Sequence, residues 1–381
     1  MSGTSITDWM NILMFLSNPF VHDPRVYHEA QTLKRYGHSV TVVAWDRSGE
    51  HPSREVLDGV MVVRIRNTGL MRLVPYDIFR MRFWWRRARL VALELSKNET
   101  FDVVHCHDLD TLPIGVWLKD RLPVKLVYDA HEVFTYMLRG EVPSFLIRRF
   151  ERMEGRMMRR ADRMITVGEK YKEYFISKGI SDIALVMNAK NIEVDGYVRP
   201  SNVQPVVTYI GSLKSTRFVK ELAHAGSEVE GIRVVIAGKG PDETEVKEIA
   251  SRYENVTFLG MVPMKDVIPL TLESDVVFTM FDPRHPLAKI GFPNKFFEAL
   301  ATGRPILASE GTYVGEIVKE LDCGVVVTPD KSGIVKGLRY VVDHPEELER
   351  MGRNALEAAK RTYNWPAQGE ALLDVYRSLE N

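Results

Sequence analysis

The sequence predicts an α/β protein with two domains, each built on a doubly wound parallel sheet of the Rossmann type. The chain has 381 residues, which is long enough for two domains with separate cores. In both halves, short apolar runs alternate with helical segments, and such βαβ units form parallel sheets with helices on both faces. Between the halves, residues 195–205 (DGYVRPSNVQP) are polar and bracketed by proline, which predicts a linker.

The same observations set the expected domain boundaries. The first domain is expected at residues 1–198 and the second at residues 199–363. A last helix is expected over residues 364–381, after a break at Asn364 and Pro366. We expect this helix to cross back onto the first domain.

The composition narrows the class of protein and its compartment. The formal net charge is +0, so the overall charge does not argue for nucleic-acid binding. The two cysteines, Cys106 and Cys323, lie in different halves and lack metal-ligand spacing, which indicates a reducing compartment. No apolar run approaches the roughly 18–20 residues that span a bilayer, and the N-terminus has no basic leader. We therefore expect a cytoplasmic protein.

The first half begins with an apolar run at residues 11–17, which predicts a strand buried on both faces. A helix follows, with Asp23 as its N-cap and Pro24 in its first turn, and it ends near Gly37. Further strands are expected at residues 39–45, 60–65, 103–105, 124–129, 164–167 and 184–187. Further helices are expected at residues 79–95, 112–119 and 151–160.

Polar residues gather where these strands end, which is where open parallel sheets bind ligands. They are Asn18, His22, Asp23, Arg25, His107, Asp108, Asp110, Asp129, His131 and Glu132. Alternatively, some of them only cap helices, as Asp110 would cap the helix that begins near Leu112. The pair Asp108 and Asp110 resembles a metal-binding Asp-x-Asp, but no diphosphate loop adjoins it in sequence, so we expect no metal.

The first half also contains a strongly basic stretch with interleaved aromatic residues. Its arginines are Arg64, Arg66, Arg72, Arg80, Arg82, Arg86, Arg87 and Arg89, against the single acid Asp77. Arginine with tryptophan and phenylalanine is typical of a segment that lies on an anionic membrane surface, which is the interpretation we favour. The alternatives are nucleic-acid binding and an ordinary helix whose aromatic side chains are core and whose arginines face solvent.

The second half repeats the alternation of strands and helices. Strands are expected at residues 206–210, 232–237, 256–259, 276–280, 306–308 and 324–327. The strand-end loops then share one edge of the sheet, at Gly211, Gly238, Gly260 and residues 281–294. Lys214 and Arg217 follow Gly211, and basic residues after a strand-end glycine suit a diphosphate. Residues 238–241 (GKGP) are not a dinucleotide fingerprint, because the third glycine is missing.

Residues 281–310 have the features of a phosphate site. An irregular segment containing Gly291 leads into a helix at residues 294–301, and the free N–H groups of a first helical turn bind phosphate or diphosphate. Glu298 lies one turn after Asn294 on the same face and can accept hydrogen bonds from ribose hydroxyls, while Lys295 adds positive charge. Alternatively, this is an ordinary amphipathic helix whose charged side chains face solvent.

Eight segments together resemble a known family. In order they are HDPRVYHEAQTLKRYGHSVTVV, FDVVHCHDLDTLPIG, VYDAHE, RRADRMITVGE, VTYIGSL, VVIAGKGP, NVTFLGMV and PNKFFEALATGRPILAS. Over nearly the whole chain they resemble the retaining nucleotide-sugar glycosyltransferases of family 4, which have the GT-B fold. The resemblance implies two Rossmann-like domains facing across a cleft, with the nucleotide-sugar donor on the second domain and the acceptor on the first.

The resemblance implies roles for individual residues. The position of Glu298 binds the donor ribose, and the position of His131 lies near the reacting sugar. Basic residues after the first strand of the second domain contact the diphosphate, the loop before the helix meets diphosphate and sugar, and backbone holds the base. With Lys295 added from the sequence, the expected donor-binding residues are Gly211, Lys214, Arg217, Gly238, Met261, Val262, Gly291, Phe292, Pro293, Asn294, Lys295 and Glu298.

The chain departs from the family pattern at three places. Ile290 replaces a glutamate that usually lies eight positions before Glu298, and Ser212 replaces a common arginine. The usual Gly-Gly loop after the first strand is replaced by residues 21–25 (VHDPR). Pro-Asn-Lys before the helix is similar to one subset of the family, so the expected fold is unchanged.

The expected activity is hexosyl transfer without a protein nucleophile, a metal or a cofactor. The leaving diphosphate would be stabilised by the basic residues of the donor site and would take the acceptor proton. His131 would orient the donor, and Asp23 or Asp108 the acceptor. The acceptor would be a glycan or a lipid-linked sugar in cell-surface synthesis, at the inner face of the membrane. The alternatives are a hydrolysing nucleotide-sugar 2-epimerase and, because of Ile290, a non-catalytic nucleotide-sugar binder.

Overall fold

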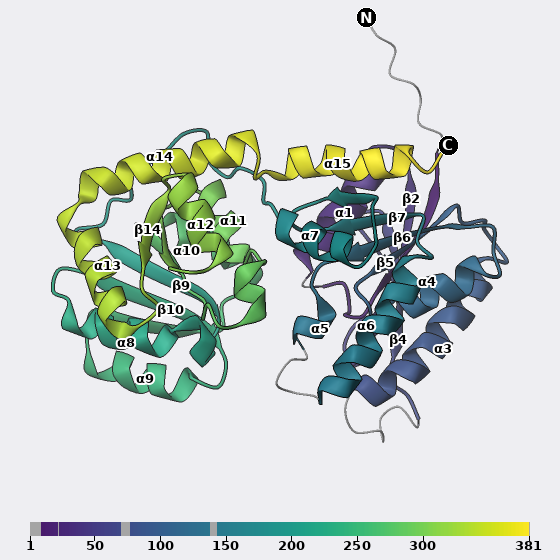
Figure 1. Ribbon diagram of the computed structural model, residues 1–381, viewed down its shortest axis with the longest axis horizontal. Coiled ribbons are helices and arrows are strands. Elements are labelled where there is room, and N and C mark those ends of the chain that lie inside the picture. Colours follow the sequence, from purple (N-terminus) through teal and green to yellow (C-terminus); the bar gives the residue numbers. More distant parts are fainter. Residues whose placement is uncertain (1–8, 22, 70–76, 138–142, 381) are drawn as a thin grey trace, which may run out of the picture. The chain divides into compact units, whose positions relative to one another are not determined.

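The computed structural model describes residues 9–21, 23–69, 77–137 and 143–380. The chain forms two compact units, drawn in Figure 1. The first contains the chain up to Val186 together with Gly369–Asn381, and the second is Met187–Gln368. Helix α15 (Trp365–Arg377) therefore starts in the second unit and continues in the first.

The first unit is built on an eight-stranded sheet with the order β3-β4-β2-β1-β5-β6-β7-β8. Its strands are β1 (Asn11–Leu16), β2 (Ser39–Asp46), β3 (Arg54–Leu57), β4 (Val60–Arg66), β5 (Val103–His107), β6 (Lys125–Ala130), β7 (Arg163–Thr166) and β8 (Ile183–Leu185). All neighbouring strands run parallel except β3 and β4. Its helices are α1 (Pro24–Arg35), α3 (Asp77–Leu95), α4 (Leu112–Lys119), α5 (Phe134–Met137), α6 (Ser144–Met158) and α7 (Glu169–Ser177).

The second unit is built on a six-stranded, entirely parallel sheet with the order β11-β10-β9-β12-β13-β14. Its strands are β9 (Val206–Ser212), β10 (Arg233–Lys239), β11 (Val256–Gly260), β12 (Val276–Thr279), β13 (Ile306–Ser309) and β14 (Gly324–Val327). Its helices are α8 (Val219–Glu228), α9 (Glu243–Arg252), α10 (Met264–Leu272), α11 (Asn294–Ala301), α12 (Tyr313–Glu320), α13 (Lys331–Asp343) and α14 (Pro345–Arg361), with short 3₁₀ turns η1 (Ser215–Arg217) and η2 (Pro286–Lys289). The predicted fold class, two parallel-sheet α/β domains, is confirmed.

Hydrophobic burial explains why the predicted strands form. All six residues of β1 are buried, as expected for the centre of a sheet covered on both faces. In the second unit, the buried residues Val207, Ile236 and Phe278 contribute to one core cluster, while the inner face of α11 packs in another. These cores hold the strand ends in place, and the candidate site residues lie at those ends.

Two features differ from the sequence expectations. The hairpin of β3 and β4 was not predicted, although Asp58 and Gly59 both have a positive φ (47° and 80°), as a type I′ turn requires. The division between the units falls at Val186 rather than after residue 198. Residues 187–198 lie in the second unit because Lys190 forms a β-bridge with Asn364 and the N–H of Glu193 donates to the carbonyl of Ala301.

The basic stretch of the first half contains both buried and exposed side chains. Arg64 is buried, donates to the carbonyl of Pro19 over 2.7 Å and pairs with Glu55. Trp84 is fully buried and stacks on Trp45 with ring centroids 5.5 Å apart. The exposed residues of α3, among those whose side chains the structure describes, are Arg82, Phe83, Arg86, Arg87, Leu90 and Glu94, and Glu94 pairs with Arg54. Arg72 lies outside the described residues. Among the described arginines of this stretch, the exposed ones, Arg82, Arg86 and Arg87, all lie on α3, and the membrane surface stays a prediction.

Among the residues that the structure describes, no helix combines the length and the apolar character needed to cross a bilayer.

Candidate functional site

The strand ends of the second unit bring two glycines into direct contact. Gly211 at the end of β9 and Gly238 at the end of β10 are paired in the sheet register, with φ values of 153° and 141°. A Cβ atom on Gly238 would lie 1.8 Å from the carbonyl oxygen of Gly211. Gly240, which was not predicted as a site residue, is equally constrained, since its Cβ would lie 2.2 Å from the oxygen of Leu213. Only glycines allow these two strand-end loops to pack backbone to backbone.

The side chain of Lys295 on α11 reaches the end of β9. Its ammonium nitrogen Nζ lies 3.9 Å from the ring centroid of Tyr209 and 3.0 Å from the position that a Cβ on Gly211 would take. The residue is only 9% exposed, so the alternative of a solvent-facing lysine is wrong. Burial, followed by the charge of Arg217, lowers the pKa of Lys295 to about 7, against an opposing effect of Glu298. The Tyr209 ring, which sequence reasoning missed, supplies a cation–π surface for this ammonium group.

Arg217 places further positive charge beside Lys295, and Lys214 precedes η1 in the same loop. The Arg217 guanidinium carbon lies 3.6 Å from the ring centroid of Phe281, on which His285 also stacks with centroids 5.1 Å apart. Lys214 is exposed at the start of η1. Burial, followed by the charge of Arg217, lowers the pKa of His285, and Lys214 adds to this effect. Arg217 therefore acts on both Lys295 and His285, with Lys214 also near His285, and the contact of these side chains with a diphosphate stays a prediction.

Glu298 is buried rather than exposed, at 7%, and it has a partner that the sequence did not predict. The Nζ of Lys190 lies 3.6 Å from Oε1 of Glu298. Lys190 is held in place because it forms a β-bridge with Asn364. Spacing could not identify this pair, since the two residues belong to distant segments.

The loop before α11 has fewer free donors than expected. The N–H of Gly291 already donates to the carbonyl of Leu287 over 2.8 Å, and Pro293 has no N–H. Gly291 is not among the described glycines with positive φ, so its conformation does not require glycine. The Phe292 side chain packs inside the unit, stacked on Phe296 with centroids 4.8 Å apart. A ligand held by this loop therefore depends on the N–H groups of Phe292, Asn294 and Lys295.

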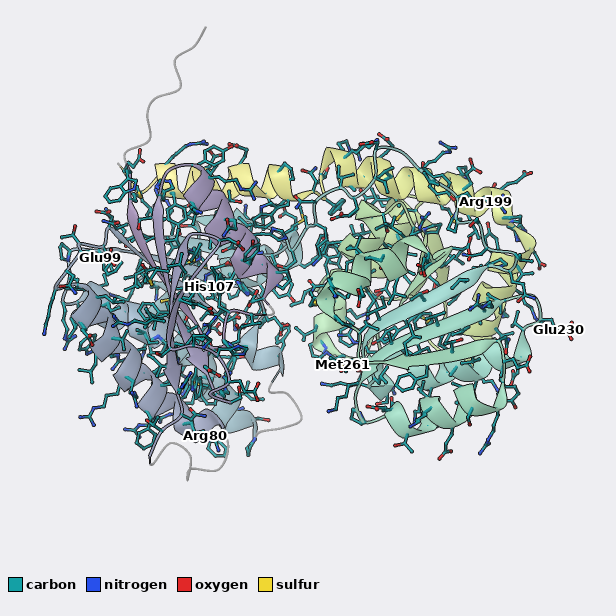
Figure 2. The ribbon with its side chains drawn as sticks, turned by 180° about the vertical axis from the view of Figure 1, so that it is seen from behind. Arg80, Glu99, His107, Arg199, Glu230 and Met261 are labelled. Carbon is teal, nitrogen blue, oxygen red and sulfur yellow. The ribbon has the colours of Figure 1, made fainter. Side chains whose placement is uncertain are left out.

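Met261 and Val262 follow β11, next to the strand that ends in Gly238. The register pairs Ala237 with Gly260, so Met261 and Gly238 lie at neighbouring strand ends. Met261 is 70% exposed and is labelled in Figure 2. The position is compatible with a base contact, which stays a prediction.

In the first unit, His131 follows β6 and lies between two carboxylates. Its Nε2 is 3.0 Å from Oδ2 of Asp129, and its Nδ1 is 3.5 Å from Oδ2 of Asp108. The backbone N–H of His131 also donates to Oδ1 of Asp108 over 3.0 Å. Burial opposes ionisation, yet Asp108 and Asp129 raise the pKa of His131 to about 10. His131 is therefore an imidazolium cation at neutral pH.

The other two predicted residues of this unit differ in their surroundings. Asp108 has φ 62° and a side chain that is 39% exposed, so its carboxylate is open to solvent. Asp23 is the N-cap of α1, as predicted, and accepts a hydrogen bond from the N–H of Val26 over 3.2 Å. Its other oxygen accepts from Asn18 over 2.9 Å. The capping role explains Asp23, and its role toward an acceptor stays a prediction. Asp110 does not cap α4, because the N-cap position is Thr111.

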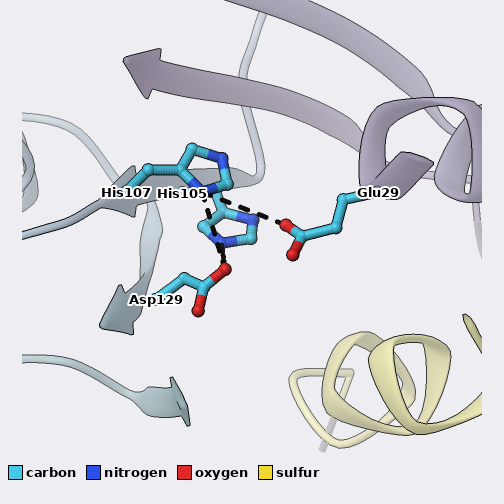
Figure 3. A group of neighbouring side chains, drawn as sticks. All are labelled: Glu29, His105, His107 and Asp129. Atoms are coloured by element: carbon cyan, nitrogen blue, oxygen red, sulfur yellow. Dashed lines mark ion pairs between the residues drawn. The ribbon is translucent and has the colours of Figure 1, made fainter. Parts of the chain in front are cut away.

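A buried cluster lies behind His131 and joins β5, β6 and α1. Figure 3 shows four of its side chains, Glu29, His105, His107 and Asp129, pointing toward one another. Arg25 contacts both carboxylates, with Nη2 2.9 Å from Asp129 and Nε 3.0 Å from Glu29. Sequence reasoning missed Glu29, although its spacing one helical turn after Arg25 is a signal for an ion pair.

The composition of this cluster is that of a metal site, but Arg25 argues against one. The possible ligand atoms of the four residues lie within 4.8 Å of one another. The guanidinium group of Arg25 already supplies the positive charge between the carboxylates, and it would repel a divalent ion placed beside it. Burial, followed by the charge of Asp129, raises the pKa of Glu29 well above its usual value, which disfavours a second negative charge in this cluster.

Comparison with known proteins agrees with this architecture. Residues 23–189 match the family model described as a glycosyl transferase 4-like domain, and residues 198–358 match the model described as glycosyl transferases group 1. Glycogen synthase of Mycobacterium tuberculosis is 24% identical over 92% of this chain and 89% of its own. Sucrose-phosphate synthase of Thermosynechococcus elongatus has a similar structure, with a TM-score of 0.80 at 15% identity over 97% of this chain and 99% of its own.

The two parallel-sheet units define the GT-B class of fold. The same fold occurs in Anabaena HepE, whose structure was solved with UDP-glucose, with a TM-score of 0.71 at 16% identity over 97% of this chain and 100% of its own. With one glycosyltransferase domain model matching each unit, the protein is a glycosyltransferase of the GT-B fold.

Proposed function

We propose that the protein is a retaining glycosyltransferase that moves a hexose from a nucleotide-sugar donor to an acceptor hydroxyl. The observation that carries this proposal is the group of three basic side chains, Lys214, Arg217 and Lys295, beside the paired strand ends of β9 and β10. A diphosphate carries the negative charge that such a group needs, and it gains further charge when it leaves the sugar. The first turn of α11 adds backbone N–H donors at the same place.

The remaining donor contacts follow from the neighbours of this group. Glu298 is an acceptor for ribose hydroxyls, and its buried ion pair with Lys190 fixes its carboxylate in one orientation. The backbone beside Gly238, Met261 and Val262 is assigned to the base. HepE, which shares the fold, was solved with UDP-glucose, and this supports a nucleotide sugar as the donor.

The charge on His131 determines which group takes the acceptor proton. The raised pKa of His131 favours its imidazolium form, which has no free lone pair and is a poor general base. We therefore assign the proton to an oxygen of the leaving diphosphate. The acceptor oxygen bonds to the anomeric carbon while the bond from that carbon to the phosphate oxygen breaks, on the same face of the sugar. The role of His131 is to orient the donor sugar, with Asp108 or Asp23 as an orienting group for the acceptor.

The acceptor is a glycan or a lipid-linked sugar, which we assign to the first unit. We assign contact with the anionic inner surface of a membrane to the exposed face of α3, where the three arginines Arg82, Arg86 and Arg87 outnumber the single acid Glu94. Its apolar side chains Phe83 and Leu90 are 37% and 57% exposed and can enter the interface between head groups and acyl chains. A cytoplasmic protein that docks there would act on an acceptor carried by the membrane.

A panel of nucleotide sugars tests this function. A true donor should raise the melting temperature, since a ligand that binds the native state stabilises it. Incubation of that donor with candidate acceptors should yield a glycoside with the anomeric configuration of the donor, as measured by NMR. Release of an epimerised free sugar would indicate the epimerase instead. Binding without turnover on any acceptor would indicate a non-catalytic nucleotide-sugar protein.

A further inference from the structure

We propose that Arg25 and Asp129 are positioning residues for the transfer reaction, because together they fix the ring of His131 through a buried chain of ion pairs. This inference rests on the proposed function and names residues that act in it without touching the substrate. The chain of contacts runs from α1 through the end of β6 to His131. It is almost sealed from water, since the side chains of Arg25, Asp129 and His131 are 5%, 0% and 13% exposed.

Asp129 is the central residue in this series of ion pairs. Its Oδ2 lies 2.9 Å from Nη2 of Arg25 and 3.0 Å from Nε2 of His131. The opposite ring nitrogen of His131 faces Asp108 at 3.5 Å. A ring held at both nitrogens has one orientation, and the low exposure of Arg25, Asp129 and His131 limits screening of their charges by water or salt.

Arg25 is itself fixed at three points. Its Nη2 reaches both oxygens of Asp129 at 2.9 Å, its Nε lies 3.0 Å from Glu29, and its Nη1 donates to the carbonyl of Val186 over 2.6 Å. Val186 is the last residue before the chain enters the second unit. Only the planar fork of a guanidinium group reaches all three partners, because an ammonium group is a single point of charge.

Of the three histidine rings in this cluster, His131 is the one whose surroundings favour the charged form. Those that face it are Asp108, Asp129, Arg25, Glu29, His107, His105 and Asp110. His107 lies 3.3 Å from His131, and His105 stacks on His107 with centroids 4.3 Å apart. Burial lowers the pKa of both, so they stay neutral beside the imidazolium ion. The Tyr376 hydroxyl, 2.8 Å from Nδ1 of His105, joins α15 to the cluster.

The first test observes His131 directly and does not depend on activity. In the full-length protein with ¹⁵N-labelled histidine, assigned with His131→Gln, the ring should remain doubly protonated at pH 8. Asp129→Asn should make it neutral at that pH. In Arg25→Lys the Nε2–H signal should broaden through faster exchange with water, whereas Arg35→Lys, an exposed change on the same helix, should preserve it. A wild-type ring that titrates near its ordinary pKa of about 6.5, or an unaltered signal in Arg25→Lys, would overturn the inference.

The second test separates this inference from the proposed function. With a donor and acceptor that react, Arg25→Lys should lower kcat by about 10- to 100-fold, the cost of a small misplacement, and leave the donor KM unchanged. If the wild type transfers sugar and Arg25→Lys transfers it equally fast, the positioning role is wrong. If the wild type transfers nothing, the proposed function fails and the NMR result decides on the chain of ion pairs. Elemental analysis that finds one divalent ion per chain would also overturn the positioning role of Arg25 and Asp129, since a metal would then occupy the cluster.

Discussion

The ammonium nitrogen of Lys190 lies 3.6 Å from a carboxylate oxygen of Glu298, and both side chains are almost buried. A carboxylate that is oriented by an ion pair keeps its second oxygen for a ligand. Removing either partner leaves the other charge buried without compensation.

Glu298→Ala should raise the donor KM more than it lowers kcat. The hydrogen bonds from ribose to a charged acceptor contribute about 1.5–3 kcal/mol, so the KM should rise by about tenfold or more. Initial-rate kinetics with varied donor measure this. The matched control is Glu316→Ala, an exposed glutamate on α12. An unchanged donor KM would exclude Glu298 from the ribose contact.

Lys295 should take up a proton when a nucleoside diphosphate binds at pH 8. Its pKa of about 7 leaves most of the amine neutral at that pH, and a nearby diphosphate favours the charged form and raises the pKa. Calorimetry in buffers with different ionisation enthalpies measures the uptake. Lys295→Met should abolish it and weaken binding, whereas Lys247→Met on the exposed face of α9 should change neither. Wild-type binding heats that are independent of the buffer would contradict the assignment.

Glu29→Gln should stabilise the protein more as the pH rises. The folded-state pKa of Glu29 lies above its ordinary value, so the native state retains a proton that the unfolded state loses. Wild-type stability therefore falls as the pH rises above about 4.5, by at most about 1.4 kcal/mol per pH unit from this group. Glutamine has no such proton. Urea unfolding at pH 5 and pH 8 measures the difference, with Glu50→Gln as an exposed control. A difference that does not change with pH would contradict the raised pKa of Glu29.

Gly238→Ala should disrupt the paired strand ends of the donor site. The added Cβ would lie 1.8 Å from the oxygen of Gly211, and the φ of 141° also disfavours alanine. A cost of about 3–4 kcal/mol would lower the melting temperature by about 10 °C. Gly196→Ala is the control, because nothing lies within 4 Å of its Cβ position. Equal melting temperatures for the two variants would mean that the strand ends can separate without cost.

The double variant Arg82→Gln, Arg86→Gln should bind anionic vesicles less tightly. Each basic residue near such a surface contributes about 1 kcal/mol, so the partition coefficient should fall by about 30-fold. Cosedimentation with phosphatidylserine vesicles at low salt measures this, and salt should weaken wild-type binding. Arg252→Gln on α9 is the control. Wild-type protein that stays in the supernatant at low salt would end the membrane proposal.

The sequence alone was sufficient for the alternation of strands and helices and for the positions of the strand ends. The apolar run of β1, the Asp23 cap of α1 and the helix that begins at Asn294 were all readable, because these signals are local. The hairpin of β3 and β4 was missed, although the sequence contains Asp58-Gly59, a dipeptide typical of a two-residue hairpin turn. For the donor site, the sequence identified candidate residues but did not show that Lys295 and Glu298 are buried. An amphipathic pattern does not show what covers a charged side chain.

Only the tertiary structure decided which of these side chains meet. Arg25 and Asp129 are 104 positions apart, and Glu298 pairs with a lysine from the segment that enters the second unit. Such pairs depend on strand order and on helix placement, which local periodicity does not encode. The pKa shifts of Lys295 and His131 follow from such contacts, because burial and a neighbouring charge are properties of the folded chain.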